Sequence, residues 1–139
     1  TGKSFSSYRT KTRKPRPFNT INIALNTDRE QLYDRINLRV DQMIEAGLVD
    51  EVKSLLKYRH LNALQTVGYS EIFEYLDGKC SLEEAVKNIK QNTRRFAKRQ
   101  ITWFKKSEDI RWFDPTDYNN ILNYLNQIVY FPSPGGQRN

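Results

Sequence analysis

The stretch TRRFAKRQITWFKK, which runs from Thr93 to Lys106, decides the fold because it combines helical periodicity with dense positive charge. From Leu82 onward, apolar residues recur at the spacing of one helix face, which predicts an amphipathic helix. The members of that apolar face are Leu82, Val86, Ile89, Phe96, Ala97, Ile101, Trp103 and Phe104. Thr93 and Gln100 fall in the middle of the same face.

The opposite face of this helix, called the basic face below, is crowded with cations. Its members are Lys87, Lys90, Arg94, Arg95, Lys98, Arg99, Lys105 and Lys106. Glu83 and Glu84 are too few to neutralise it through pairs on the helix surface. A solvated charged face explains many patterns of this kind. The alternative is a polyanion contact, since lysine and arginine at this density neutralise phosphates.

Gln100 favours the polyanion contact. An amide in an apolar face is costly unless hydrogen bonds satisfy it, and the edge of a nucleobase would provide them. A neighbouring backbone group is the commoner partner of such an amide. Trp103 is of a type that stacks on bases, although an aromatic side chain on a helix usually belongs to the core.

Length and composition restrict the class of protein. The 139 residues suffice for one core, and a formal net charge of +7 favours nucleic acid or another polyphosphate as partner. No apolar run approaches the roughly 20 residues of a membrane span, and no signal peptide is visible, so we expect a soluble, cytoplasmic protein. Cys80 and His60 are each alone, which excludes a disulfide, a cysteine zinc site, a serine triad and a two-histidine metal site.

The whole chain is predicted to be mainly α with two short β-strands. Strands are expected at 20–25 and 110–113, and further helices at 28–46, 49–58, 70–78 and 117–130. Expected caps are Thr27 or Asp28, Ser70, and the Ser81–Glu84 capping box, with Gly47 ending the first helix. These elements predict three parts: an extended basic arm (1–19), a helical part (20–115), and a C-terminal helix with a disordered tail (116–139).

A second candidate site lies in the helix predicted over 28–46. Its core face is formed by Leu32, Ile36, Val40 and Met43. Arg39 falls on that face and Arg35 lies at its edge, and a guanidinium on a core face must find an anion. A salt bridge is the commoner solution, and a phosphate clamp is the functional one. The candidate partners for a salt bridge are Asp28, Asp41 and Glu71.

Three stretches occur together in an order that one protein family shares. They are DREQLYDRINLRVDQMIEAGLVDEV (28–52), ALQTVGYSEIFEYLDG (63–78) and TRRFAKRQITWFKK (93–106). Together they resemble the C-terminal half of bacterial tRNA dimethylallyltransferases, also called tRNA isopentenyltransferases. The resemblance implies the C-terminal part of an α/β P-loop-type domain whose P-loop half is absent, with the arm rejoining it from an insertion domain. The TGKS at Thr1 to Ser4 lacks the context of a P-loop, and we reject that interpretation.

The resemblance implies a transferase that moves a dimethylallyl group from its diphosphate to the exocyclic amine of the adenosine next to the tRNA anticodon. Its implied partners are tRNA and dimethylallyl diphosphate, its cofactor is Mg²⁺, and the full-length enzyme is expected to be a monomer. The family's P-loop, catalytic aspartate and metal site belong to the other half. No catalytic residue is therefore assigned here, and this chain alone is expected to be inactive.

The resemblance also assigns binding residues. The predicted tRNA contacts are Gln65, Thr66, Val67, Gly68, Tyr69, Ser70, Lys98, Arg99, Gln100, Ile101, Thr102, Trp103, Phe104 and Lys105. Arg35 and Arg39 are assigned to the diphosphate. These residue types suit the chemistry, because an extruded adenine needs stacking and cations on the flanking backbone. A leaving diphosphate likewise needs cationic stabilisation.

Two alternatives rest on charge alone. A non-catalytic helical RNA-binding module would have no upstream P-loop half. A protein-interaction domain that binds an acidic partner would show no salt-dependent affinity for RNA.

Overall fold

The structure is a computed structural model that describes residues 18–130. The disordered tail and nearly all of the basic arm predicted above therefore lie outside the described residues. The elements are β1 (Asn22–Leu25), α1 (Arg29–Glu45), α2 (Leu48–Ser54), the 3₁₀ helices η2 (Leu56–Tyr58) and η3 (Asn62–Leu64), α3 (Tyr69–Leu76), α4 (Leu82–Phe104), β2 (Ile110–Phe113) and α5 (Tyr118–Tyr130). The prediction of a mainly α chain with two short strands is confirmed, although α2 and η2 replace the single helix expected over 49–58.

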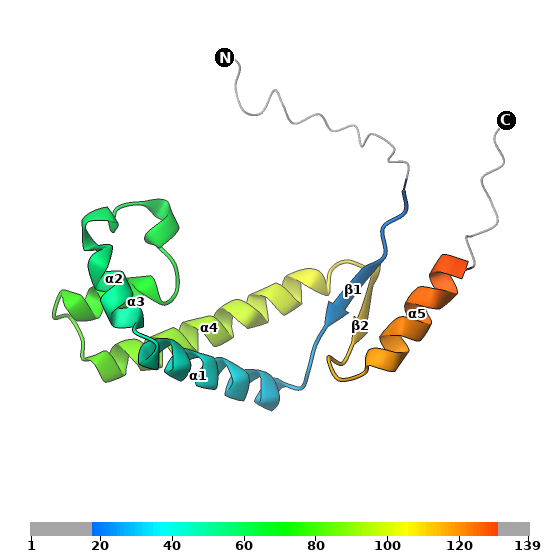
Figure 1. Ribbon diagram of the computed structural model, residues 1–139, viewed down its shortest axis with the longest axis horizontal. Coiled ribbons are helices and arrows are strands. Elements are labelled where there is room, and N and C mark those ends of the chain that lie inside the picture. The colour runs from blue at the N-terminus through cyan, green and yellow to red at the C-terminus, as the bar shows by residue number, and fades with distance from the viewer. Residues whose placement is uncertain (1–17, 131–139) are drawn as a thin grey trace, which may run out of the picture.

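The two strands pair with each other across most of the chain. β1 and β2 run parallel, with Asn22 opposite Ile110 and Leu25 opposite Phe113. Parallel strands need a long crossover connection, and the segment from α1 to α4 provides it. In Figure 1 the helices α1 to α4 lie to one side of the strands, and α5 lies to the other. α5 contacts β2 through the rings of Tyr124 and Phe113, whose centres are 5.4 Å apart.

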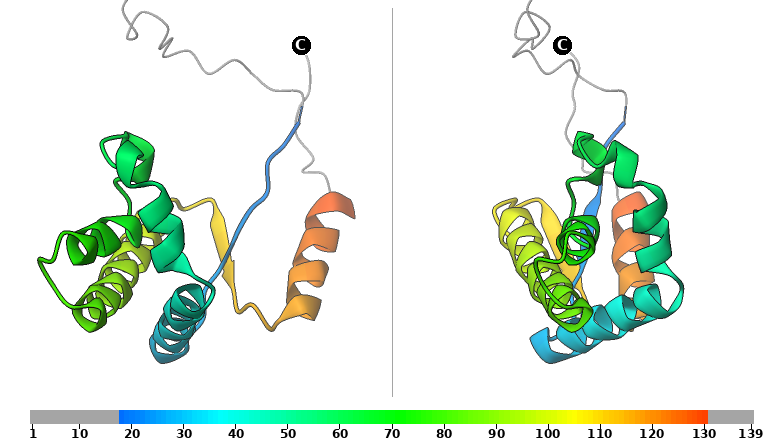
Figure 2. Two further views of the ribbon diagram at one scale, coloured as in Figure 1. Left: turned by 60° about the vertical axis from the view of Figure 1, so that its left-hand side comes forward. Right: turned by 90° about the vertical axis from the view of Figure 1, so that its left-hand side faces the viewer.

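The hydrophobic core lies among α1 to α4, which Figure 2 shows gathered apart from α5. α4 packs against α1 and α3, and α2 packs against α3. The buried apolar residues are Val40, Leu48, Val52, Ile72, Phe73, Ala85 and Ile89. Those from α4 all belong to its first half, so the core ends before α4 reaches the strands.

Local sequence explains where the two long helices begin. Asp28 caps α1, since its Oδ1 accepts the backbone N–H of Glu30 at 2.8 Å and of Gln31 at 3.2 Å. Ser81 and Glu84 form the expected capping box at α4, with reciprocal bonds of 3.1 and 2.9 Å. These two predictions are confirmed.

The start of α3 corrects one prediction. Ser70 is expected to cap this helix, but the N-cap is Gly68, whose φ of 104° favours glycine. The carboxylate of Glu71, which is 6% exposed, accepts the N–H of Gly68 at 2.8 Å and the Nδ2–H of Asn92 at 2.7 Å. The longer acidic side chain in the first turn thus performs the capping that we assigned to the serine hydroxyl.

An ion pair fastens the segment between α2 and α3 onto α3. The Arg59 guanidinium donates to both Asp77 carboxylate oxygens, at 2.7 and 2.8 Å, and Lys79 adds a third bond of 3.0 Å. The same guanidinium lies 5.1 Å from the centre of the Phe73 ring. These hydrogen bonds, that of Arg59 foremost, hold the pKa of Asp77 well below its usual range.

We expect this ion pair to make stability depend on pH. Because the pKa of Asp77 is lower in the folded protein than in the unfolded chain, the pair contributes stability above about pH 4. That contribution is lost as the pH falls through the folded pKa. Asp77→Asn should therefore lower the thermal unfolding midpoint at pH 7, and its difference from wild type should shrink in acid.

The matched control is Glu108→Gln, which removes an exposed carboxylate that has no ion pair within residues 18–130. It should show little difference from wild type at either pH. A difference between wild type and Asp77→Asn that stays constant from pH 7 to pH 3 would contradict the assignment.

Candidate nucleic-acid interface

The candidate site lies where α1 and α4 separate. The two helices run antiparallel and diverge toward the end at which α1 begins and α4 ends (Figure 1). β1 leads into this end of α1, and β2 follows this end of α4. Side chains from the helices and the strands therefore surround open space here instead of filling a core.

Three adjoining pockets occupy this end. The Tyr33 pocket, of about 390 Å³, lies between Tyr33 on α1, Lys98 on α4, and Lys105, which caps the end of α4. The Arg35 pocket, of about 310 Å³, is lined by Arg35 and Gln100, and the strand pocket, of about 370 Å³, lies between β1, β2 and Gln100. Ile101 lines all three, so the end of α4 forms their common wall.

The Arg35 pocket brings together residues from two predicted sets. Arg35 comes from α1 and is predicted to bind the diphosphate, and Gln100 comes from α4 and is predicted to bind tRNA. Gln100 lies on the expected apolar face of α4 but is exposed, so its amide has no burial cost for a nucleobase to offset. Helical periodicity marks a face but does not show what covers it, and the core covers only the first half of α4.

The apolar face of α4 is open beyond this point within the described residues. Phe96, Trp103 and Phe104 are 49%, 64% and 41% exposed. Trp103 packs edge-on against Phe104, with ring centres 4.9 Å apart, and it is not a core residue. Its ring is therefore accessible for stacking, which suits the predicted tRNA contact.

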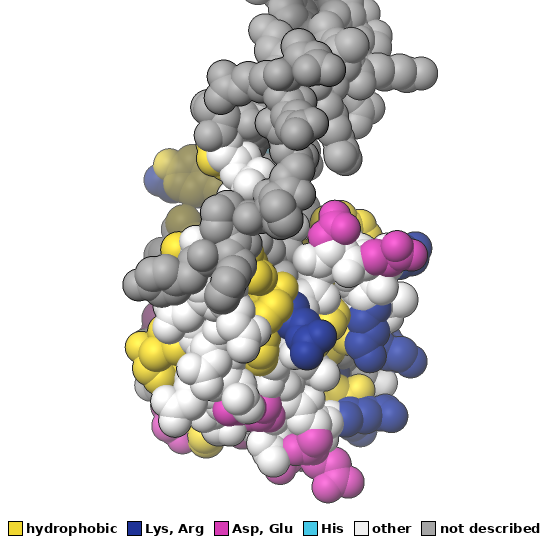
Figure 3. Space-filling view, turned by 90° about the vertical axis from the view of Figure 1, so that its right-hand side faces the viewer, with side chains coloured by type: hydrophobic (Ala, Val, Ile, Leu, Met, Phe, Trp, Pro, Cys, Tyr) yellow, Lys and Arg dark blue, Asp and Glu magenta, His cyan; other side chains and the backbone are white. Residues whose placement is uncertain are grey.

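The basic face of α4 divides into two halves. In the packed half, Lys90 pairs with Asp41 at 2.6 Å and Arg94 donates to Asn37 Oδ1 at 2.6 Å. In the open half, Lys98, Arg99 and Lys105 are exposed. No ion pair engages these three side chains within residues 18–130. Figure 3 shows lysine and arginine gathered along one side of this end of the molecule, with hydrophobic side chains between them.

Arg39 departs from its predicted place. It is exposed, whereas the next residue, Val40, is 3% exposed and belongs to the core. Only a narrow stripe of α1 is buried against α4 and α2. Successive residues of a helix are about 100° apart around its axis, so Arg39 lies outside the stripe that contains Val40. The prediction that Arg39 forms a salt bridge is also wrong within residues 18–130. Each proposed carboxylate is engaged elsewhere: Asp41 with Lys90, Asp28 as the α1 cap, and Glu71 with Gly68 and Asn92.

The second predicted tRNA segment, from Gln65 to Ser70, is separate from the three pockets. It precedes and begins α3, and Figure 1 shows it away from the C-terminal end of α4. The Gln65 amide donates to the Arg59 carbonyl at 2.5 Å. The Tyr69 hydroxyl donates to the Glu51 carboxylate, which raises the pKa of Tyr69 above its ordinary value. The tRNA contact of this segment stays a prediction.

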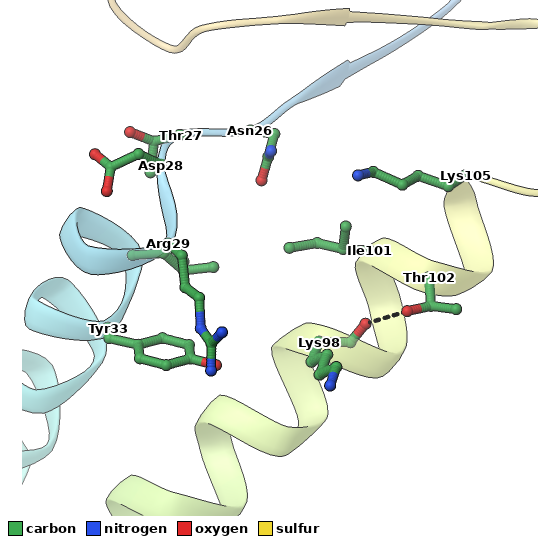
Figure 4. A pocket seen from close by; sticks show the side chains of 10 residues that line it. Asn26, Thr27, Asp28, Arg29, Tyr33, Lys98, Ile101, Thr102 and Lys105 are labelled. Atoms are coloured by element: carbon green, nitrogen blue, oxygen red, sulfur yellow. Dashed lines mark hydrogen bonds between the residues drawn. The ribbon is translucent and has the colours of Figure 1, made fainter.

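The structure adds residues that sequence reasoning missed. The Tyr33 ring centre lies 5.1 Å from the Arg29 guanidinium and 5.7 Å from that of Arg94. Figure 4 shows Arg29 extending across Tyr33 at the wall of the Tyr33 pocket. The four-residue spacing of Arg29 and Tyr33 on α1 is a signal that predicts their contact. No sequence signal indicates that Arg94 reaches the same ring from α4.

Other kinds of site find little support in the part of the chain that is described. Across residues 18–130, no three His, Cys, Asp or Glu side chains gather as a metal site would require. No described helix is both long enough and apolar enough to cross a membrane. His60 is exposed, and Cys80 is a free thiol whose pKa is raised by burial.

Relatives of this chain are known by sequence. tRNA dimethylallyltransferase 1 of Bacteroides thetaiotaomicron is 55% identical over 96% of this chain, and the match covers 44% of the relative. The tRNA dimethylallyltransferase of Cytophaga hutchinsonii is 50% identical over 90% of this chain and 41% of the relative. The chain thus spans less than half the length of these curated relatives.

Two solved structures also match this chain. The tRNA isopentenylpyrophosphate transferase of Bacillus halodurans matches 82% of this chain and 39% of its own, with a TM-score of 0.73 and 43% identity. The enzyme of the same kind from Staphylococcus epidermidis matches 84% of this chain and 39% of its own, with a TM-score of 0.74 and 34% identity. The sequence profile described as IPP transferase matches residues 1–107. The predicted resemblance is confirmed, and the chain belongs to the IPP transferase family.

Proposed function

We propose that this chain is the tRNA-binding part of a tRNA dimethylallyltransferase. The whole protein would transfer a dimethylallyl group from dimethylallyl diphosphate to the exocyclic amine of the adenosine next to the anticodon. One observation carries the proposal: the exposed cations Lys98, Arg99 and Lys105 have no carboxylate partners within residues 18–130, and Lys98 and Lys105 line the Tyr33 pocket. The names of the relatives support the same activity.

The open half of α4 supplies the groups that an extruded base requires. Lys98, Arg99 and Lys105 neutralise phosphates on either side of the base. The 64% exposed ring of Trp103 offers a stacking surface, and the exposed amide of Gln100 offers a donor and an acceptor for a base edge. Together these contacts offset the unstacking of the adenosine, which costs a few kcal/mol.

Arg35 is the residue of α1 best placed to meet the diphosphate. It lines the Arg35 pocket together with Gln100, so an anion held there would lie beside the base. A guanidinium presents several donors in one plane and stabilises charge that develops on a leaving diphosphate. Arg39 is assigned to the same anion by resemblance, but it does not line this pocket.

The remaining chemistry belongs, in this proposal, to the portion of the enzyme outside the chain. That portion would supply the P-loop, the catalytic aspartate and the Mg²⁺ site, and the chain alone would be inactive. The chain's length, less than half that of its curated relatives, supports this division. The described residues do not fit a Mg²⁺ site, since none of their acidic, His or Cys side chains form a group of three.

The first test concerns the basic face. In the full-length protein, Lys98→Ala with Lys105→Ala should weaken binding of an unmodified tRNA anticodon stem–loop. The slope of log affinity against log salt should fall by about 1 for each phosphate that the variant no longer neutralises. Fluorescence anisotropy across a salt series measures both quantities.

The matched control removes the same charge elsewhere, through Lys53→Ala with Lys57→Ala on α2 and η2. Equal decreases of affinity and slope in the two double variants would contradict the proposed surface. They would show that net charge alone, as in a module that binds any polyanion, accounts for the binding.

The second test concerns the diphosphate. Arg35→Ala should lower kcat/KM for dimethylallyl diphosphate about 10- to 100-fold, because the variant cannot form the charge-assisted hydrogen bonds of the guanidinium. Arg39→Ala, one turn further along α1 and outside the pocket, should have a smaller effect. Steady-state kinetics with saturating tRNA separate the two variants. An unchanged KM and turnover for Arg35→Ala would show that the assignment is wrong.

A further inference from the structure

A buried carboxylate joins the start of α3 to the middle of α4. Glu71, in the first turn of α3, is 6% exposed, and its two carboxylate oxygens accept hydrogen bonds from different elements. One oxygen accepts the N–H of Gly68 at 2.8 Å, and the other accepts the Nδ2–H of Asn92, on α4, at 2.7 Å. Capping α3 requires only the first of these bonds. The second is additional to the cap, and it fixes the start of α3 relative to α4.

Asn92 is itself held from its other side. Its Oδ1 accepts a hydrogen bond from Arg95, on the next turn of α4, at 3.4 Å. The amide thus directs its oxygen at a cation and its N–H at the Glu71 carboxylate. Within residues 18–130, no buried side-chain nitrogen or oxygen lacks a hydrogen-bond partner, so the network is complete. A polar network whose members are all bonded holds its elements rigidly.

The network anchors the segment 65–70, which is predicted to contact tRNA. At the first residue of the segment, the Gln65 amide donates to the Arg59 carbonyl at 2.5 Å. Further along, the Gly68 N–H is bound by the buried carboxylate. The two residues between these anchors, 66 and 67, are exposed. The segment therefore presents exposed side chains from a backbone that is fixed on both sides.

The other proposed RNA surface, at the end of α4, lies apart from this segment (Figure 1). An RNA that contacts both surfaces binds most tightly when their relative position is fixed in advance, because ordering them on binding costs free energy. The bond between Glu71 and Asn92 supplies this fixed relation. It holds the segment on the same helix whose C-terminal end carries the other surface.

We propose that Glu71 and Asn92 are positioning residues for tRNA, which hold the segment 65–70 at a fixed place relative to the open half of α4. This inference rests on the proposed function, which gives neither residue a role, and on the predicted contact of the segment with tRNA. Both side chains act on the protein backbone and not on the RNA itself. Neither lines the Arg35 pocket, so the diphosphate site should not depend on them.

The test exchanges the two side chains in the full-length protein. Asn92→Asp replaces the donor by a second carboxylate, which repels that of Glu71 and breaks the bond. It should raise the KM for tRNA about tenfold and leave kcat and the KM for dimethylallyl diphosphate unchanged. Adding Glu71→Gln to this variant should restore the KM for tRNA. The introduced amide donates to the introduced carboxylate, while its carbonyl still accepts the Gly68 N–H.

Two further variants keep the test interpretable. Gln91→Glu adds the same negative charge to an exposed neighbour on α4, so it measures the repulsion of RNA by charge alone and should raise the KM for tRNA far less. Asn92→Ala removes the bond without adding a charge. It should also raise the KM for tRNA, and it replaces Asn92→Asp if circular dichroism shows that the latter does not fold.

Each result decides the inference. If Asn92→Asp behaves like Gln91→Glu, or if Asn92→Ala has the KM for tRNA of wild type, the positioning role is overturned and the proposed function stands. The role is also overturned if the folded exchange variant does not recover, or if kcat falls as far as the KM for tRNA rises, since the bond would then serve the general fold. If the wild-type protein shows no salt-dependent binding of an unmodified anticodon stem–loop, the proposed function fails together with this inference.

Discussion

The packing of α1 against α4 is the constraint on which the rest of the structure depends. These helices belong to the crossover that joins two parallel strands, so their ends must return to the same sheet. Their close packing in one half buries Val40, Ala85 and Ile89 together with α2 and α3. Their divergence in the other half leaves space next to the strands. The core and the candidate site therefore lie at opposite ends of the same pair of helices, α1 and α4.

The same division gives α4 two different tasks. In its packed half the cations serve the fold, as Lys90 does through its 2.6 Å pair with Asp41. In its open half Lys98, Arg99 and Lys105 meet no carboxylate within residues 18–130, and Trp103 stays exposed. The basic residues of α4 are continuous in the sequence, but those of the packed half stabilise the fold and those of the open half are available to a ligand. What separates the halves is the covering by neighbouring helices, not the residue type.

The sequence predicts the elements better than their surroundings. The Asp28 and Ser81 caps and the period of α4 depend on local contacts, which a sequence pattern records. Arg39 is placed wrongly, and the exposure of Gln100 is not foreseen, because periodicity marks a face without showing which helix covers it. Family resemblance assigns Arg35 and Gln100 to two different ligands, and the structure places both residues at one pocket. The contact of Arg94 with Tyr33 joins two helices, and no local rule predicts it.

Hydrogen exchange of the full-length protein with and without the unmodified anticodon stem–loop tests the central claim most directly, because it locates the RNA surface without a mutation. The account predicts slower exchange at the amides of residues 98–105 at the end of α4 when RNA is bound. The amides of α5 serve as an internal reference that should not change. Slower exchange in α5 with none at residues 98–105 would contradict the account, since the RNA would then bind elsewhere on the molecule.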